Sequence, residues 1–187
     1  MNATGSQGFI PAGYIYKRIV SRPDWIKNPM VKDIYSASSH EDFCDYISYW
    51  KHNGWWLFDQ PQDMDQIIVA ESLNRSEFAL FYYEMFNQQF DEYDRKWSGF
   101  EPEPSFKLDV QPPQESRLVG YDVVSFECRN QPECSPLSCN ALADEIPVNE
   151  NCLFKDFESA KAALEADKFF ETEPGPFRIF RVYVIDN

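Results

Sequence analysis

Residues 118–127 read LVGYDVVSFE, residues 154–170 read FKDFESAKAALEADKFF, and residues 176–185 read PFRIFRVYVI. The first and last segments are short and rich in β-branched and aromatic residues, which is typical of strands. In the middle segment, Phe157 and Leu164 fall on one helical face with Ala160. The loop after the first segment holds four of the five cysteines. This third of the chain therefore predicts a unit of strand, loop, helix and strand.

The upstream sequence predicts a similar mixture of elements. We expect a strand over 14–20, a helix over 40–52, a helix over 62–73 with Pro61 at its start, and a central strand over 78–86. The last of these, FALFYYEMF, is apolar on both alternating faces, as in a strand that is covered on both sides. Strands and helices joined by such irregular connections favour an α+β domain, built on a mainly antiparallel sheet with helices packed on it.

A short internal repeat is also visible. Leu57-Phe58 precedes a turn, a helix and the strand from Phe78, and Leu153-Phe154 precedes a turn, a helix and the strand from Phe177. The order and approximate spacing agree, so we interpret this as a pseudo-repeat of an LF, helix, strand unit. The competing interpretation is that Leu-Phe recurs by chance.

The positions of glycine, proline and polar residues predict the organisation of the chain. Residues 1–13 are small, polar and interrupted by Gly and Pro, and are expected to form a flexible arm. Residues 14–187 are expected to form a single domain. The polar, acidic and proline-containing stretch from 87 to about 117 predicts a long connection, which is either functional or a seam between two halves.

Charge limits the classes of partner. The chain of 187 residues carries 17 Lys and Arg against 31 Asp and Glu, a formal net charge of −14. Such a field repels nucleic-acid phosphates and anionic lipid, so nucleic acid is disfavoured and a basic protein is the favoured partner. The alternative is that the charge serves solubility alone. No apolar stretch long enough to span a bilayer and no secretory signal are found, which predicts a soluble cytoplasmic protein.

The cysteines allow two interpretations. Cys128, Cys134, Cys139 and Cys152 follow the spacing C-x5-C-x4-C-x12-C. Four thiolates can hold structural zinc, but zinc loops usually carry two ligands only a few residues apart, and no C-x2-C pair occurs here. A zinc or redox site therefore competes with ordinary reduced thiols, which we favour, and no other cofactor is expected. A disulfide such as Cys128 to Cys139 requires an oxidising compartment.

Two further groups of residues bear on chemistry. His40 and Cys44 are four residues apart on the expected helix, a spacing that permits a thiolate nucleophile, although packing of Cys44 as a small apolar residue is favoured. In the loop 135–140, small polar residues precede a helix start expected at Asn140, where capping is favoured over anion binding. Neither group carries a catalytic signature, and the chain is not expected to be an enzyme.

Acidic and aromatic residues gather before the expected seam. Paired carboxylates support sugar hydrolysis or cation binding only at a fixed separation, which the sequence does not give. Aromatic residues ringed by charge are typical of tight protein interfaces. We therefore expect a partner-binding surface at Asp91, Glu92, Tyr93, Asp94 and Trp97, and the competing interpretation is a solvated acidic face.

The C-terminal third resembles a group of uncharacterised bacterial proteins. The shared pattern is the GYDV strand at 120–123, the loop CSPLSCN at 134–140, the turn N-x-x-LF-x-D and the aromatic strand at 176–185. No activity is known for that group, so the resemblance implies a real module and no catalytic residue. The leading hypothesis is an inhibitor-like or immunity-like protein-binding module. The alternatives are a metal or redox site at the cysteines and a hydrolase that uses paired carboxylates.

Overall fold

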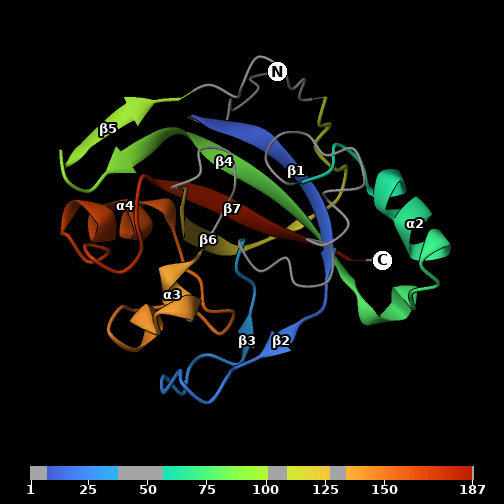
Figure 1. Ribbon diagram of the computed structural model, residues 1–187, viewed down its shortest axis with the longest axis horizontal. Coiled ribbons are helices and arrows are strands. Elements are labelled where there is room, and N and C mark those ends of the chain that lie inside the picture. Colours follow the sequence, from blue (N-terminus) through green and yellow to red (C-terminus); the bar gives the residue numbers. More distant parts are fainter. Residues whose placement is uncertain (1–7, 38–56, 101–108, 127–133, 187) are drawn as a thin grey trace.

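The computed structural model describes residues 8–37, 57–100, 109–126 and 134–186. Its centre is a five-stranded antiparallel sheet in the order β1-β4-β7-β6, with β5 paired to β4 (Figure 1). The strands are β1 (Phe9–Lys17), β4 (Ala79–Asp91), β5 (Lys96–Gly99), β6 (Arg117–Ser125) and β7 (Phe177–Ile185). Helices pack on this sheet, which confirms the predicted α+β class.

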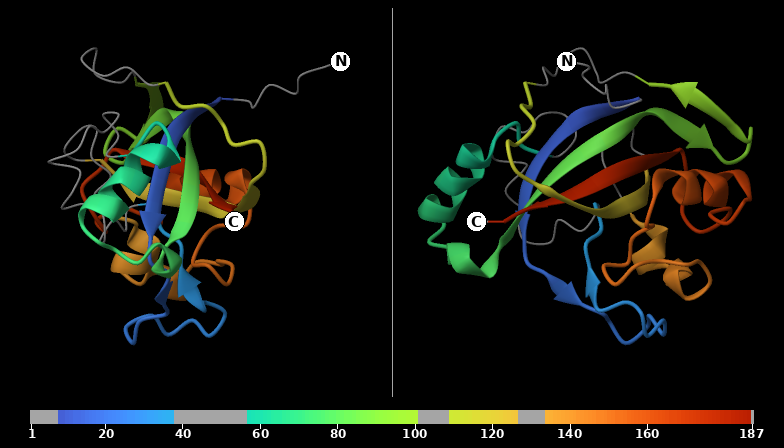
Figure 2. Two further views of the ribbon diagram at one scale, coloured as in Figure 1. Left: turned by 90° about the vertical axis from the view of Figure 1, so that its right-hand side faces the viewer. Right: turned by 180° about the vertical axis from the view of Figure 1, so that it is seen from behind.

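Smaller elements surround the sheet. The helices are α2 (Pro61–Ala70), α3 (Pro136–Cys139) and α4 (Phe157–Glu165), with single 3-10 turns η1 (Arg75–Glu77) and η2 (Leu142–Asp144). A two-stranded sheet pairs β2 (Val20–Ser21) with β3 (Asp33–Ile34). Figure 1 shows α2 and α4 at opposite ends of the main sheet, and the view from behind in Figure 2 shows the same separation.

The two longer helices form within the predicted segments but end earlier than expected, at Ala70 and Glu165. Helix α2 begins with Pro61, whose fixed φ suits the first helical position, and it buries Met64 and Ile67. Helix α4 is capped by Asp156, whose carboxylate accepts the backbone N–H of Ser159 at 2.8 Å. Both helices pack on the same face of the sheet, the face from which Tyr16 and Tyr121 project. The Tyr16 hydroxyl donates to Asp65 of α2, and the Tyr121 ring contacts Phe157 of α4.

Two expected strand boundaries were wrong. Strand β1 begins at Phe9 and not at Tyr14, because residues 9–11 pair with β4 and a register shift between Pro11 and Gly13 absorbs the irregular sequence. Strand β4 continues to Asp91 through polar residues, since its far end is partly exposed, so the long connection expected from residue 87 starts with a hairpin. The expected helix 40–52, with His40 and Cys44, lies outside the described residues.

The short helix α3 corrects a third expectation. It ends at Cys139, and Asn140 follows it as the C-terminal capping residue, so no helix starts at Asn140. Pro136 sets the start of the helix one turn earlier than expected. Ser135 precedes the helix, but its hydroxyl does not cap it and instead donates to Asp122 of β6 at 2.6 Å.

The predicted repeat has a structural counterpart in two isolated β-bridges. Tyr14 of β1 exchanges two backbone hydrogen bonds with Phe58, at 2.8 and 3.0 Å, and Tyr121 of β6 exchanges two with Phe154, both at 2.9 Å. In each half, a helix begins three residues after this Phe and leads to a central strand. The Leu-Phe pair is therefore a strand-edge contact in both halves.

A glycine precedes the bridging tyrosine in each half. Gly13 and Gly120 have φ values of 141° and 153°, and each lies at a register shift of its strand. A Cβ on Gly120 would lie 2.7 Å from the Leu153 Cβ and 2.8 Å from the Phe154 carbonyl oxygen. A side chain is therefore excluded where the Leu-Phe segment meets β6.

The two halves meet at the centre of the sheet. Strand β4 pairs with β7 about Tyr83 and Val182, which lie opposite each other and are also the partners of Gly13 and Gly120. The order β1-β4-β7-β6 is thus symmetric about this pair. Because strands from both sides of the expected seam share one sheet, the halves form one continuous β-structure.

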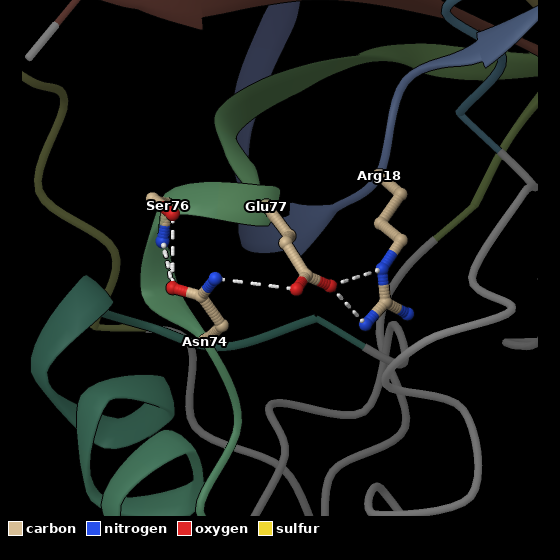
Figure 3. A network of polar contacts seen from close by, with 4 residues as sticks. All are labelled: Arg18, Asn74, Ser76 and Glu77. Carbon is tan, nitrogen blue, oxygen red and sulfur yellow. Dashed lines mark hydrogen bonds and ion pairs between the residues drawn. The ribbon is translucent and has the colours of Figure 1, made fainter.

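A polar network holds the turn between α2 and β4 (Figure 3). The guanidinium of Arg18, just beyond β1, donates to Glu77 at 2.9 and 3.2 Å, and the Asn74 amide donates to the other Glu77 oxygen at 3.2 Å. These hydrogen bonds lower the pKa of Glu77. The turn is therefore tied to the end of β1.

Candidate protein-interaction surface

The turn between β4 and β5 carries most of the residues that the sequence marks for partner binding. Asp91 pairs with Lys96 across the hairpin, and its carboxylate accepts the backbone N–H groups of Tyr93 at 2.9 Å and Asp94 at 2.8 Å. An aspartate that closes such a local turn restricts the loop backbone. Asp91 therefore holds the shape of the turn and presents Tyr93 outward.

Two exposed aromatic rings meet beside this turn. Tyr93 is 77% exposed and Phe170, in the loop after α4, is 45% exposed. Their ring centroids lie 6.1 Å apart in an edge-to-face arrangement with an interplanar angle of 76°. Each ring comes from a different segment, so the pair forms only when the hairpin rests on the α4 region.

Polar contacts fix the hairpin on the end of α4. Arg95 pairs with Asp167 at 2.7 Å and also donates to the Glu165 carbonyl oxygen at 3.2 Å. The Trp97 indole N–H donates to the Glu165 carboxylate at 2.8 Å, while its ring packs on Phe90 with centroids 5.2 Å apart. Trp97 is therefore half-buried and supports the surface from below.

Glu92 occupies an unusual position under this surface. It is only 6% exposed, and one carboxylate oxygen accepts the backbone N–H of Gly175 at a long 3.4 Å. The other oxygen, Oε2, is buried and has no hydrogen-bond partner among the described residues. Burial raises the pKa of Glu92, the backbone N–H groups of Gly175 and Glu171 oppose the shift, and the nearby Asp91 and Glu171 carboxylates add to it.

Negative charge dominates the surroundings of the aromatic pair. Segments 91–97 and 165–175 contain seven acidic residues and three basic ones: Asp91, Glu92, Asp94, Glu165, Asp167, Glu171 and Glu173 against Arg95, Lys96 and Lys168. Two of the three cations already have partners, since Arg95 pairs with Asp167 and Lys96 pairs with Asp94 at 2.7 Å. We call this set, together with Tyr93 and Phe170, the hairpin surface.

The five residues expected to bind a partner thus have different positions. The structure brings Asp91, Glu92, Tyr93 and Asp94 together in one turn, but only Tyr93 and Asp94 are exposed in it. Phe170 was missed. Its signal is the sequence FFETE at 169–173, in which Phe169 enters the core and the following Phe is left outside among acidic residues.

The cysteine loop is only partly described. The Cys134 and Cys139 sulfurs lie next to each other, with Cα atoms 6.5 Å apart, a pairing that permits a disulfide, while the expectation of reduced thiols stays a prediction. Cys152 is buried, and burial together with the Asp122 and Asp144 carboxylates raises its pKa to about 12. Cys128 lies outside the described ranges.

No metal centre forms within the ranges that the structure describes. No three His, Cys, Asp or Glu side chains gather there in a way that could hold a metal ion, so Cys152 does not complete a site with Cys134 and Cys139. A site that depends on Cys128 stays a prediction. In the same ranges, no helix is long and apolar enough to cross a membrane.

A buried carboxylate on β6 was not foreseen. Asp122 is fully buried and accepts the Ser135 hydroxyl at 2.6 Å and the Ala37 backbone N–H at 2.7 Å. Burial raises its pKa, while the donors and the Lys17 charge oppose the shift. Because Asp122 joins three separate segments in the interior, we assign it a structural role.

Comparison with protein-family models, with curated proteins and with solved structures finds no match. The resemblance of the C-terminal third to uncharacterised bacterial proteins therefore stays a prediction. The candidate function therefore depends on the chemistry of the surface itself.

Proposed function

We propose that this chain is a protein-binding module that captures a basic protein through the hairpin surface, in the manner of an inhibitor or an immunity protein. One observation carries the proposal. The Tyr93 and Phe170 rings lie exposed and in contact, within a local excess of acidic residues, on a turn braced by Asp91 and by the end of α4.

The hairpin surface combines features that raise both affinity and association rate. Aromatic anchors near the centre of an interface contribute much of the binding free energy, because they bury large areas with few rotatable bonds. Charge around such anchors steers an oppositely charged partner and raises the association rate. The net charge of −14 acts in the same direction at longer range. Binding is therefore expected to weaken as salt concentration rises.

The test compares three immobilised proteins in lysate of the source organism. The first is wild type, the second carries Tyr93→Ala and Phe170→Ala, and the third carries Val69→Ala, which removes an 80% exposed apolar side chain from α2. We expect a basic protein that wild type and the Val69 variant retain equally and the double variant loses. Equal retention by all three proteins, or retention of acidic proteins only, would contradict the proposal.

The adjacent Cys134 and Cys139 sulfurs favour a second candidate function, a thiol redox site. Cys134 and Cys139 flank the buried residues Ser135 and Leu137 within six residues of chain, and Cys139 is exposed. A disulfide that closes so short a loop and reaches the surface is accessible to thiol exchange. Thiol titration of the folded protein with and without a dithiol reductant tests this function. Two additional thiols after reduction would support it, and an unchanged number would exclude it.

A further inference from the structure

The carboxylate of Glu92 points to the chemistry that the hairpin surface recognises. A buried acidic oxygen without a donor is costly to a folded protein, and replacing it by a neutral group would remove that cost. Within the described residues, neither a cation nor a hydroxyl compensates Oε2. The position therefore has an unmet requirement for a hydrogen-bond donor.

The position of Glu92 relates it directly to the exposed rings. It precedes Tyr93 in the chain, and its carboxylate faces the backbone N–H groups of Glu171 and Gly175, in the loop that also carries Phe170. The 3.4 Å hydrogen bond from Gly175 is a weak restraint. An arginine that reaches Glu92 must therefore displace residues 171–175, and the Gly175 hydrogen bond opposes this only weakly.

We propose that the hairpin surface binds an arginine side chain of its partner, with the guanidinium against the Tyr93 and Phe170 rings and donating to Glu92. This inference rests on the proposed function and names the partner's anchoring group. A guanidinium is planar, stacks on aromatic rings and donates in a fork that matches a carboxylate. A lysine ammonium lacks the planar fork and is more strongly hydrated.

The surroundings of Glu92 favour a cationic ligand over a neutral donor. Glu171 and Glu173 lie in the same loop, and neither has an ion-pair partner among the described residues. Asp94 and Asp167 are neutralised by Lys96 and Arg95, which leaves Glu171 and Glu173 with only Lys168 as a cation in the Phe170 loop. A guanidinium entering there meets uncompensated carboxylates.

The experiment uses octa-arginine and octa-lysine peptides, which carry equal charge, titrated into the full chain by calorimetry. We expect wild type to bind octa-arginine about tenfold tighter than octa-lysine, since only the guanidinium can donate two parallel hydrogen bonds to a carboxylate while it stacks on the rings. Glu92→Gln is expected to remove this preference by lowering the affinity for octa-arginine about tenfold.

Two matched variants remove one charge elsewhere. Glu145→Gln follows η2 and Glu71→Gln follows α2, and both exposed residues lie outside the hairpin surface. Each variant is expected to lower the affinity for both peptides equally and by less than about threefold, because it changes only the long-range electrostatic attraction. Thermal unfolding of all variants establishes that they fold.

Three results would overturn the inference. They are equal affinity of wild type for both peptides, an equal loss of affinity for both peptides in Glu92→Gln, and no binding of octa-arginine by wild type. None of these decides the lysate comparison of the Tyr93 and Phe170 variants, because a basic partner that uses lysine would still be lost from the double variant. The arginine inference and the proposed function can therefore fail separately.

Discussion

The two halves of the sheet share one construction but differ in the segment that connects each helix to its central strand. In both, a Gly-Tyr pair on an outer strand bridges to a Leu-Phe segment, a helix comes next and a central strand completes the unit. After α2, the chain returns to β4 through a short turn tied by Arg18 and Glu77. After α4, a longer loop exposes Phe170, which contacts Tyr93 of the hairpin. The bridges, helices and central strands that both halves share form the fold, and the loop after α4, which the first half lacks, forms the hairpin surface together with the hairpin.

A second difference lies inside the sheet. The residue after the bridging tyrosine is Ile15 in the first half and Asp122 in the second, and both are fully buried. Ile15 packs in the apolar core, whereas Asp122 binds Ser135 and Ala37. At this position the second half therefore uses a polar interior contact where the first half uses an apolar one.

The largest expected effect tests the shared construction. Gly120→Ala should lower the free energy of unfolding by roughly 3 kcal/mol or more, because the new Cβ would overlap Leu153 and Phe154 at a φ of 153°. Gly13→Ala should be destabilising for the same backbone reason if the halves are equivalent. Gly99→Ala in β5 is the control, since no atom lies within 4 Å of its Cβ position. Chemical denaturation measures all three, and a harmless Gly13 substitution would break the comparison.

A smaller effect is expected where the halves differ inside the core. Asp122→Asn should cost about 2 kcal/mol, because its new amide group cannot accept the Ala37 N–H and the Ser135 hydroxyl together. Ser135→Ala removes one donor and should cost about 1 kcal/mol. Urea unfolding checks both values. Unchanged stability in Asp122→Asn would show that the polar contact does not hold these loops.

The smallest effect has the opposite sign and concerns the unshared hairpin. The pKa of Glu92 is raised by burial, so the folded protein binds more protons than the unfolded chain, and stability falls as pH rises through that window. Glu92→Gln is neutral at every pH and should therefore melt at a higher temperature than wild type at pH 7. The difference should shrink as pH falls through the folded pKa of Glu92 and vanish only below the ordinary glutamate pKa of the unfolded chain. Thermal melts between pH 4 and 7 check this, and a lower melting temperature for Glu92→Gln at pH 7 would contradict it.

The sequence predicted the elements with strong local signals. Apolar periodicity on one face located α2 and α4, continuous apolar runs located β4 and β7, and the Leu-Phe repeat coincides with the two bridges. The extension of β4 and β1 was missed, since pairing with a neighbouring strand supports irregular or polar residues that have no strand pattern of their own. Such support depends on contacts distant in sequence.

The hairpin surface was predicted in part for the same reason. Acidic and aromatic composition marked Tyr93 and its neighbours, but the partner ring of Phe170 comes from a segment 77 residues later. Composition also gave no sign that Glu92 is buried while Asp94 is exposed. Their difference arises from the loop at 171–175, which covers one side of the turn.

The exposed ring pair is proposed to anchor a basic partner, and its contribution to affinity can be measured directly. The measurement is the affinity of the protein captured from lysate for Tyr93→Ala/Phe170→Ala, relative to Val69→Ala, by calorimetry at low salt. We predict a loss of about 100-fold for the double variant, since two aromatic anchors are removed, and no change for the Val69 variant. Equal affinities of the two variants for that protein would contradict the proposed role of the rings.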